Sequence, residues 1–181
     1  MNIIITGASS GIGREAALRL AANPQNRVIA IARNEKALRR LAEECENKNI
    51  IAVPFDITAS RSSIRELKKS LSNDPGTIDI LINNAGYLVN KPFEMHSEEE
   101  VASTVAVNFT GPAALISELL PLLGRGSHVV NIGSMGGFQG SLKFTGLSWY
   151  SAAKGALAVL TESLAARSEE RRVGKECRSR W

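Results

Sequence analysis

Tyr150 and Lys154 form the pair whose types and spacing best fit acid–base chemistry. They are four residues apart in the stretch WYSAAKG, with only small residues between them, so their side chains would share one face of a helix. A tyrosine phenol ordinarily loses its proton at a pH of about 10, but a fixed ammonium nearby favours the phenolate. The pair therefore predicts a tyrosine that exchanges protons near neutral pH.

A second candidate site is the glycine-rich turn TGASSGIG, residues 6–13. Its glycines Gly7, Gly11 and Gly13 follow an apolar run and precede a helical pattern. Glycine permits a positive φ and a close approach of ligand to backbone, and the start of the next helix favours a phosphate. The order of strand, turn and helix predicts a dinucleotide-binding turn; a tight turn with no ligand is the alternative.

The residue that ends the second apolar run discriminates between two cofactors. NAD sites usually place an acid about 20 residues after the glycines, where it binds the ribose 2′-hydroxyl. Here that position is Ala32, followed by Arg33, and the first carboxylate is Glu35. Since a guanidinium pairs well with a 2′-phosphate, we expect NADP, with NAD as second choice if Arg33 is only a solvated residue.

Apolar runs that alternate with helical patterns must position these residues. We expect a capping box of Ser97 and Glu100 at the start of the long fourth helix, strands at 2–6, 27–32, 50–54, 78–83 and 128–132, and helices at 12–22, 34–47, 60–72, 97–122 and from 148 onward. Near-continuous hydrophobic strands are typical of a parallel sheet covered on both faces. The order predicts an α/β fold: a doubly wound, Rossmann-like parallel sheet in three α/β/α layers.

Composition favours a globular cytoplasmic protein. Hydrophobic residues make up 44% and charged residues 22% of 181 residues, which suits one domain with a substantial core. The N-terminus has no basic leader, no run reaches the roughly 18 apolar residues of a membrane span, and two cysteines fit a reducing compartment. We therefore expect no membrane partner.

The net charge of +4 comes mostly from the last residues. Residues 167–181 carry six basic and three acidic side chains, and residues 1–166 are close to neutral. Without a basic stripe over the body, a nucleic-acid partner is not expected. We expect a domain over 1–166 that carries the site and a charged tail over 167–181. That tail is a solvated end, a stretch foreign to the fold, or a basic arm.

Five motifs occur in a fixed order along residues 1–166: TGASSGIG, NNAG at 83–86, Asn108 in VNFTG, Ser134 in NIGSMGG, and YSAAK. Together they resemble the short-chain dehydrogenase/reductase family. The resemblance implies an NAD(P)-dependent oxidoreductase that transfers hydride between a nicotinamide and a carbonyl or secondary alcohol substrate, with no metal. It implies a homodimer or homotetramer for a full-length form.

The resemblance also implies four catalytic residues. Tyr150 would be the general acid/base, Lys154 would tune it and hold the nicotinamide ribose, and Ser134 would bind the substrate oxygen, with Ser141 a less favoured substitute. Asn108 precedes Pro112 by four residues. Because proline has no N–H, the helix should kink there and free the Asn108 carbonyl for a water that would link Lys154 to solvent. A kink that serves packing alone is the alternative.

The cofactor site implied by the resemblance draws on the turn, on the strand ends and on the catalytic pair. Asp56 would contact the adenine amino group, although an aspartate that only caps a turn is the alternative. Asn83 and its neighbours would line the adenosine side and tie the central strands together. The full set is Gly7, Ser9, Ser10, Gly11, Ile12, Gly13, Arg33, Asp56, Ile57, Asn83, Ala85, Gly86, Tyr150 and Lys154.

Two departures from the family pattern bear on function. Ser134 and Tyr150 are 16 residues apart, a few more than usual, and the extra segment 138–148 would either line the substrate pocket or displace Ser134. Family members normally continue for two more strands and a loop that covers the substrate. We therefore expect a C-terminally incomplete fold with one core face exposed, and a nucleotide-binding fragment without turnover is the alternative function.

Overall fold

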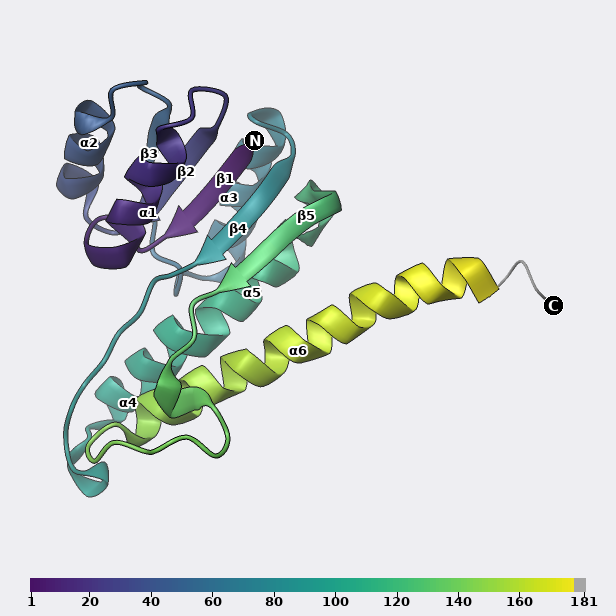
Figure 1. The fold of residues 1–181 in the computed structure, drawn as a ribbon. Helices are drawn as coiled ribbons and strands as arrows, with labels where there is room; N and C mark the ends of the chain where they lie inside the picture. The colour runs from purple at the N-terminus through teal and green to yellow at the C-terminus, as the bar shows by residue number, and fades with distance from the viewer. Residues whose placement is uncertain (178–181) are drawn as a thin grey trace.

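The computed structural model describes the backbone of residues 1–177 and the side chains of residues 1–166. Five parallel strands form one sheet in the order β3-β2-β1-β4-β5 (Figure 1). Their bounds are β1 Asn2–Thr6, β2 Arg27–Ala32, β3 Ile50–Pro54, β4 Ile78–Asn83 and β5 Leu123–Asn131. The predicted doubly wound parallel α/β fold is confirmed.

Helices cover both faces of this sheet because consecutive strand residues point to opposite sides. Ile3 and Ile5 pack on the side of α1 and α2, whereas Ile4 and Leu81 pack on the side of α3 and α5. The α-helices are α1 Gly11–Ala21, α2 Glu35–Glu44, α3 Arg61–Asn73, α4 Glu98–Val105, α5 Gly111–Leu119 and α6 Ser148–Cys177; the 3₁₀ turns are η1 Phe93–Met95, η3 Leu120–Leu122 and η4 Met135–Gly137.

The long fourth helix departs from α geometry where its sequence predicted a kink, and the departure is a π-helical segment. It begins with the predicted capping box of Ser97 and Glu100. Between α4 and α5 lies a π-helical segment, η2, at Ala106–Thr110, where the N–H of Gly111 donates to the carbonyl of Ala106. Because Pro112 has no N–H to continue the α-helical ladder, the deformation takes the form of a π turn.

β5 is longer than its apolar run and lies at the edge of the sheet. It begins at Leu123 instead of residue 128, and its pairing with β4 is irregular between Ile78 and Ile80. Val129 packs toward α3 and α5, whereas Val130, on the opposite face, is 41% exposed. The face of β5 that carries Val130 is therefore partly open at this edge of the sheet, and the C-terminally incomplete fold expected from the sequence stays a prediction.

The run Glu98–Leu122 has the length and mean hydropathy, 1.3, of a membrane span, a property that counting uninterrupted apolar residues missed. Leu115, Ile116 and Leu119 pack within the core. A single run of this kind is also typical of a core helix, so it is weak evidence for a membrane segment.

α6 continues to Cys177 without a break at residue 166. Its first half crosses α4 and the end of β5, and its second half projects beyond the sheet (Figure 1). Residues 178–181 of the expected tail lie outside the described residues, as do the side chains of 167–177. The boundary between domain and tail at residue 166 stays a prediction.

Candidate active site

The glycine turn connects β1 to α1 and needs its glycines for two different reasons. Gly7 and Gly11 have φ values of 68° and 54°, which side-chain-bearing residues rarely adopt. A Cβ on Gly7 would lie 2.7 Å from the Cα of Ala85, and one on Gly13 would lie 2.5 Å from the Gly7 carbonyl oxygen. No described atom lies within 4 Å of a Cβ on Gly11, so the turn is packed at Gly7 and Gly13 and open at Gly11.

The start of α1 differs from the starts of α2, α3 and α4. Those helices begin with Asn34, Ser60 and Ser97, whose side chains each accept from a backbone N–H. Ser10 caps α1 without such a bond within the described residues. The first N–H groups of α1 therefore keep their capacity to bind an anion, beside the exposed residues Ser10 and Ile12 and the half-buried Ser9.

Thr6 and Asn84 tie this turn to the end of β4, a link expected for the neighbours of Asn83 but not for Thr6. The Thr6 hydroxyl accepts from the backbone N–H groups of Asn84 (3.0 Å) and Ala85 (3.1 Å). The Asn84 amide donates to the carbonyls of Thr6 (3.1 Å) and Gly7 (3.3 Å). Thr6 is the first residue of TGASSGIG and Asn84 lies within NNAG, so membership in these two motifs was the signal in the sequence that could have indicated their contact.

The other residues of NNAG lie at the carboxyl end of β4. Asn83 is buried, and its Nδ2 donates to Oδ1 of Asn131 on β5 at 2.8 Å, so its side chain joins the two strands. Ala85 is half-buried and Gly86 is exposed. A Cβ on Gly86 would lie 3.5 Å from Oδ1 of Asn108, which places this segment against the π turn.

Asp56 and Ile57 follow β3 at the same edge of the sheet. Oδ1 of Asp56 accepts from the backbone N–H (2.9 Å) and hydroxyl (2.7 Å) of Thr58, the geometry of a turn-capping aspartate. Ile57 is buried, and its carbonyl oxygen lies 2.9 Å from where a Cβ on Gly111 would be. The loop after β3 therefore touches the long helix and has one carboxylate oxygen already engaged.

Arg33 lies exposed just after β2. The N–H of Ala8 donates to the carbonyl of Ile31 at 3.2 Å, which holds the end of β2 against the glycine turn. Glu35, the first carboxylate after β2, accepts from Arg39 at 2.6 Å. The Arg33 guanidinium has no protein partner in the part of the chain that the structure describes, so it is available to an anion at the turn.

Lys154 is the buried cation of the site. It is 3% exposed, and its Nζ donates to the carbonyl of Ile132 at 2.8 Å. The same Nζ lies 6.0 Å from the centroid of the Tyr150 ring, as their shared helix face predicted. Burial lowers the pKa of Lys154 below its usual value because desolvation disfavours the ammonium.

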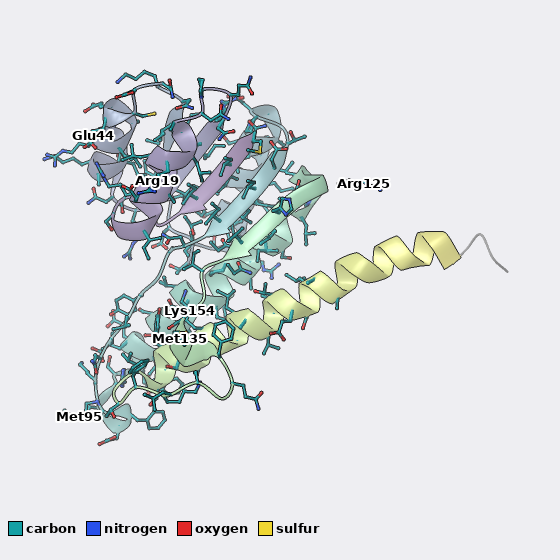
Figure 2. All side chains as sticks on the ribbon, viewed as in Figure 1. Arg19, Glu44, Met95, Arg125, Met135 and Lys154 are labelled. Atoms are coloured by element: carbon teal, nitrogen blue, oxygen red, sulfur yellow. The ribbon has the colours of Figure 1, made fainter. Side chains whose placement is uncertain are left out.

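Ser134 comes directly before η4. Two glycines in η4, Gly136 and Gly137, allow this turn to pack closely against α6. A Cβ on Gly136 would lie 2.5 Å from Oγ of Ser151, and one on Gly137 would lie 2.9 Å from the backbone nitrogen of Gly155. Figure 2 labels Lys154 and Met135 where α6 passes this turn. The close packing brings the loop that carries Ser134 onto the helix of Tyr150 and Lys154.

The two candidate serines differ in what engages their hydroxyls. Ser141 Oγ lies 2.5 Å from the carbonyl oxygen of Met135 and 2.8 Å from that of Phe138, so its one hydrogen is engaged within the loop. Ser134 Oγ makes no hydrogen bond to any described residue. This geometry favours Ser134 over Ser141 as a donor to a substrate.

The extra segment 138–148 lines a cavity of about 540 Å³ on α6. Its walls include Phe138 and Phe144 from the segment, and Gly155 and Glu162 from α6. Among the described residues that line this cavity, neither Ser134 nor Tyr150 is found. The segment thus forms a hollow on another side of α6 from the candidate catalytic pair.

Asn108 is fully buried within the π turn. Its Nδ2 donates to the carbonyls of Tyr87 (2.6 Å) and Thr104 (2.8 Å), and its Oδ1 accepts from the Tyr87 N–H (3.3 Å). The side chain therefore fastens the loop after β4 to the long helix, and it fixes the backbone on which the predicted relay depends.

Comparisons with known proteins point to one family. The family model described as short chain dehydrogenase matches residues 1–175. An uncharacterized oxidoreductase of Staphylococcus aureus is 31% identical over 163 residues, which cover 89% of this chain and 68% of the relative. Another, from Staphylococcus saprophyticus, is 31% identical over 179 residues, covering 98% and 70%.

Solved structures agree in fold. A short-chain dehydrogenase from Streptomyces avermitilis has a TM-score of 0.82 at 38% identity, and the match covers 92% of this chain but only 60% of that one. A metagenomic short-chain oxidoreductase in complex with NADP has a TM-score of 0.82 at 26% identity, covering 95% and 77%. An enzyme from Burkholderia phymatum in complex with NAD has a TM-score of 0.81 at 27% identity, covering 90% and 58%.

Proposed function

Because the chain belongs to the short-chain dehydrogenase family, we propose that it is an NADP-dependent oxidoreductase that interconverts a carbonyl compound and a secondary alcohol. The observation that carries the proposal is the buried Lys154, with Nζ 6.0 Å from the centre of the Tyr150 ring. It lies at the carboxyl edge of the sheet, where open α/β folds bind their ligands.

The nucleotide-binding turn fits a dinucleotide. The space beside Gly11 and the uncapped N–H groups of α1 suit a pyrophosphate. Gly7, Ser9, Ser10, Ile12 and Gly13 would form the rest of this cradle. NADP is favoured over NAD because Arg33 is unpaired among the described residues and Glu35 is engaged by Arg39.

The remainder of the cofactor site would follow the ends of β3 and β4. Asp56 and Ile57 would lie at the adenine, although the turn bond of Asp56 leaves it fewer free lone pairs. Ala85 and Gly86 would face the adenosine side, and the Asn83 side chain would brace the strands from within. Lys154 would hold the nicotinamide ribose.

In the catalytic step, Tyr150 would donate a proton to the carbonyl oxygen as that oxygen gains negative charge. Ser134 would donate a hydrogen bond to the same oxygen, and the ammonium of Lys154 would stabilise the phenolate left behind. The nicotinamide, when bound, supplies the hydride. Asn108 would anchor a water that returns a proton toward Lys154, supported by the π turn and by three hydrogen bonds to its side chain.

A full-length form assayed for NADPH oxidation against a panel of ketones and aldehydes tests this proposal. We expect oxidation that depends on the carbonyl compound, and the reverse reaction with the matching alcohol and NADP⁺. NADPH binding without oxidation by any member of a broad panel would contradict the proposed activity.

A nucleotide-binding fragment without turnover is the second candidate for the 181-residue chain itself. It is favoured by the coverage of only 60% of the Streptomyces avermitilis structure and by the open face at Val130. Fluorescence titration of NADPH, followed by the carbonyl assay on the same 181-residue chain, distinguishes the two. We further propose a cytoplasmic enzyme with a small-molecule substrate and a homodimer or homotetramer for the full-length form.

A further inference from the structure

A chain of polar side chains, buried at Asn83 and half-buried at Asn131 and Thr161, crosses from β4 through β5 to α6. Asn83 Nδ2 donates to Asn131 Oδ1 (2.8 Å), and Asn131 Nδ2 donates to the hydroxyl of Thr161 on α6 (2.8 Å). That hydroxyl donates in turn to the carbonyl of Leu157 (2.7 Å). Because the Thr161 hydroxyl gives its one hydrogen to Leu157, it accepts from Asn131, and the chain runs from strand to helix. Oδ1 of Asn83, at the start of the chain, is buried and has no hydrogen-bond partner among the described residues.

A second link joins the same elements at Ile132, the residue directly after β5. The N–H of Ile132 donates to the carbonyl of Asn83 (2.9 Å), and the carbonyl of Ile132 accepts from Lys154 Nζ (2.8 Å). Lys154 and Thr161 are seven residues apart and therefore lie on one face of α6. The helix is thus attached to the end of β5 at two points, about two turns apart.

We propose that Asn131 and Thr161 are positioning residues that set the height and rotation of α6, and thereby the places of Tyr150 and Lys154. Sliding the helix by one residue moves it about 1.5 Å and would separate the half-buried Asn131 amide from the Thr161 hydroxyl, which is its acceptor on α6. This proposal rests on the proposed function, since Tyr150 and Lys154 are its catalytic pair.

The other contacts of α6 do not by themselves fix its height and rotation. η4 meets the helix through glycines, which let α6 come close but offer no side chain that locks its height. The second half of α6 projects beyond the sheet (Figure 1). Ala153 and Leu157 bury apolar surface on the inner face, but apolar contact is not directional. The hydrogen bonds of Asn131 and Lys154 are directional, so they can fix the height and rotation of α6.

Ser163 offers a matched control. Its hydroxyl donates to the carbonyl of Val159 (2.8 Å), four residues earlier, as Thr161 does with Leu157. Ser163 is exposed and has no partner on another element among the described residues. Comparing Thr161→Val with Ser163→Ala therefore separates the bond to Asn131 from the local bond to the helix backbone.

The first readout is steady-state kinetics of the full-length form. Thr161→Val is expected to lower kcat at least about tenfold, since misplacement of reacting groups by ångströms has effects of that size or larger. KM for the carbonyl compound and Kd for NADPH should stay within about twofold. Thr161→Ser, which restores the hydroxyl, should recover most of kcat, and Ser163→Ala should match the wild type.

The second readout needs neither cofactor nor substrate. Acetic anhydride labelling of the 181-residue chain, followed by mass spectrometry, measures how often Lys154 becomes accessible relative to the exposed Lys143. Thr161→Val should raise this ratio at least about threefold because the helix opens more readily. If Thr161→Val does not fold, Asn131→Ala applies the same two readouts from the strand.

Equal kcat and equal labelling for Thr161→Val and Ser163→Ala would overturn the positioning role. A loss of kcat that Thr161→Ser does not restore would overturn it as well. If no carbonyl compound of the panel makes the wild-type full-length form oxidise NADPH, the proposed function fails. The labelling ratio then decides alone whether Thr161 holds Lys154 in place.

Discussion

Tyr150 and Lys154 share a helix face, but the protein holds them differently. Lys154 is buried and bonded to the Ile132 carbonyl, whereas Tyr150 is half-buried and its hydroxyl has no partner among the described residues. In the proposed function, the fixed cation would stabilise the phenolate and the unengaged phenol would give its proton to the substrate. Tyr150→Phe in the full-length form is expected to lower kcat by about 100-fold or more, with NADPH affinity retained. Turnover within about tenfold of the wild type would show that another group is the acid.

Burial of Lys154 makes folding stability depend on pH in a defined direction. Its pKa is lowered in the folded state, so between that lowered value and 10.5 the unfolded chain binds more protons than the folded chain. Stability therefore rises with pH across that window. We expect the wild type to gain free energy of unfolding relative to Lys154→Met as the pH rises toward 10.5. Urea denaturation of both proteins at several pH values measures this, and a difference independent of pH would contradict it.

Arg33 decides between two cofactors if the proposed site is correct. Arg33→Ala is expected to weaken NADPH binding roughly tenfold or more, the usual effect of a lost charge-assisted hydrogen bond, and to leave NADH binding almost unchanged. Arg19→Ala, in the last turn of α1 away from the glycine turn (Figure 2), is the control. Equal losses for both nucleotides would contradict a contact with the 2′-phosphate.

Among the elements, the unit of β1, the glycine turn and α1 contains one glycine that is needed for packing, Gly13, and one that faces open space, Gly11. Gly13→Ala would place a Cβ 2.3 Å from Nδ2 of Asn84, so we expect it to destabilise the fold by about 1–3 kcal/mol. Gly11→Ala meets open space and costs only its positive φ, about 1 kcal/mol. Urea denaturation compares the two variants. A larger loss for Gly11→Ala would mean that the turn is packed differently.

For the long helix, the sequence predicted the start of the helix and the site of its irregularity, but not the π geometry found there. The capping box of Ser97 and the deformation before Pro112 both follow from local chemistry. The choice of a π turn depends in addition on Gly111, which packs against the Ile57 carbonyl. It also depends on Asn108, which is bonded to Tyr87 in a distant loop.

At the scale of the whole molecule, the predicted nucleotide site and the second half of α6 lie apart (Figure 1). The glycine turn lies between β1 and α1, and the second half of α6 projects away from the sheet (Figure 1). We therefore expect deletion of 167–181 to change NADPH affinity by less than about twofold, because the α6 backbone over 167–177 projects away from the turn. Fluorescence titration of both chains measures this. A loss above about fivefold would make residues 167–181 part of the working fold.

The sequence by itself determined the parallel α/β fold, the glycine turn and the shared face of Tyr150 and Lys154. Each of these follows from periodicity or from residues within one turn of each other. Only the tertiary structure decided that Thr6 and Asn84 lock the turn, that Lys154 bonds to Ile132, and that Asn131 reaches Thr161. These partners lie 22 to 78 residues apart. Local patterns fix which face of an element is buried, but the atoms that meet across that face depend on how the elements pack together.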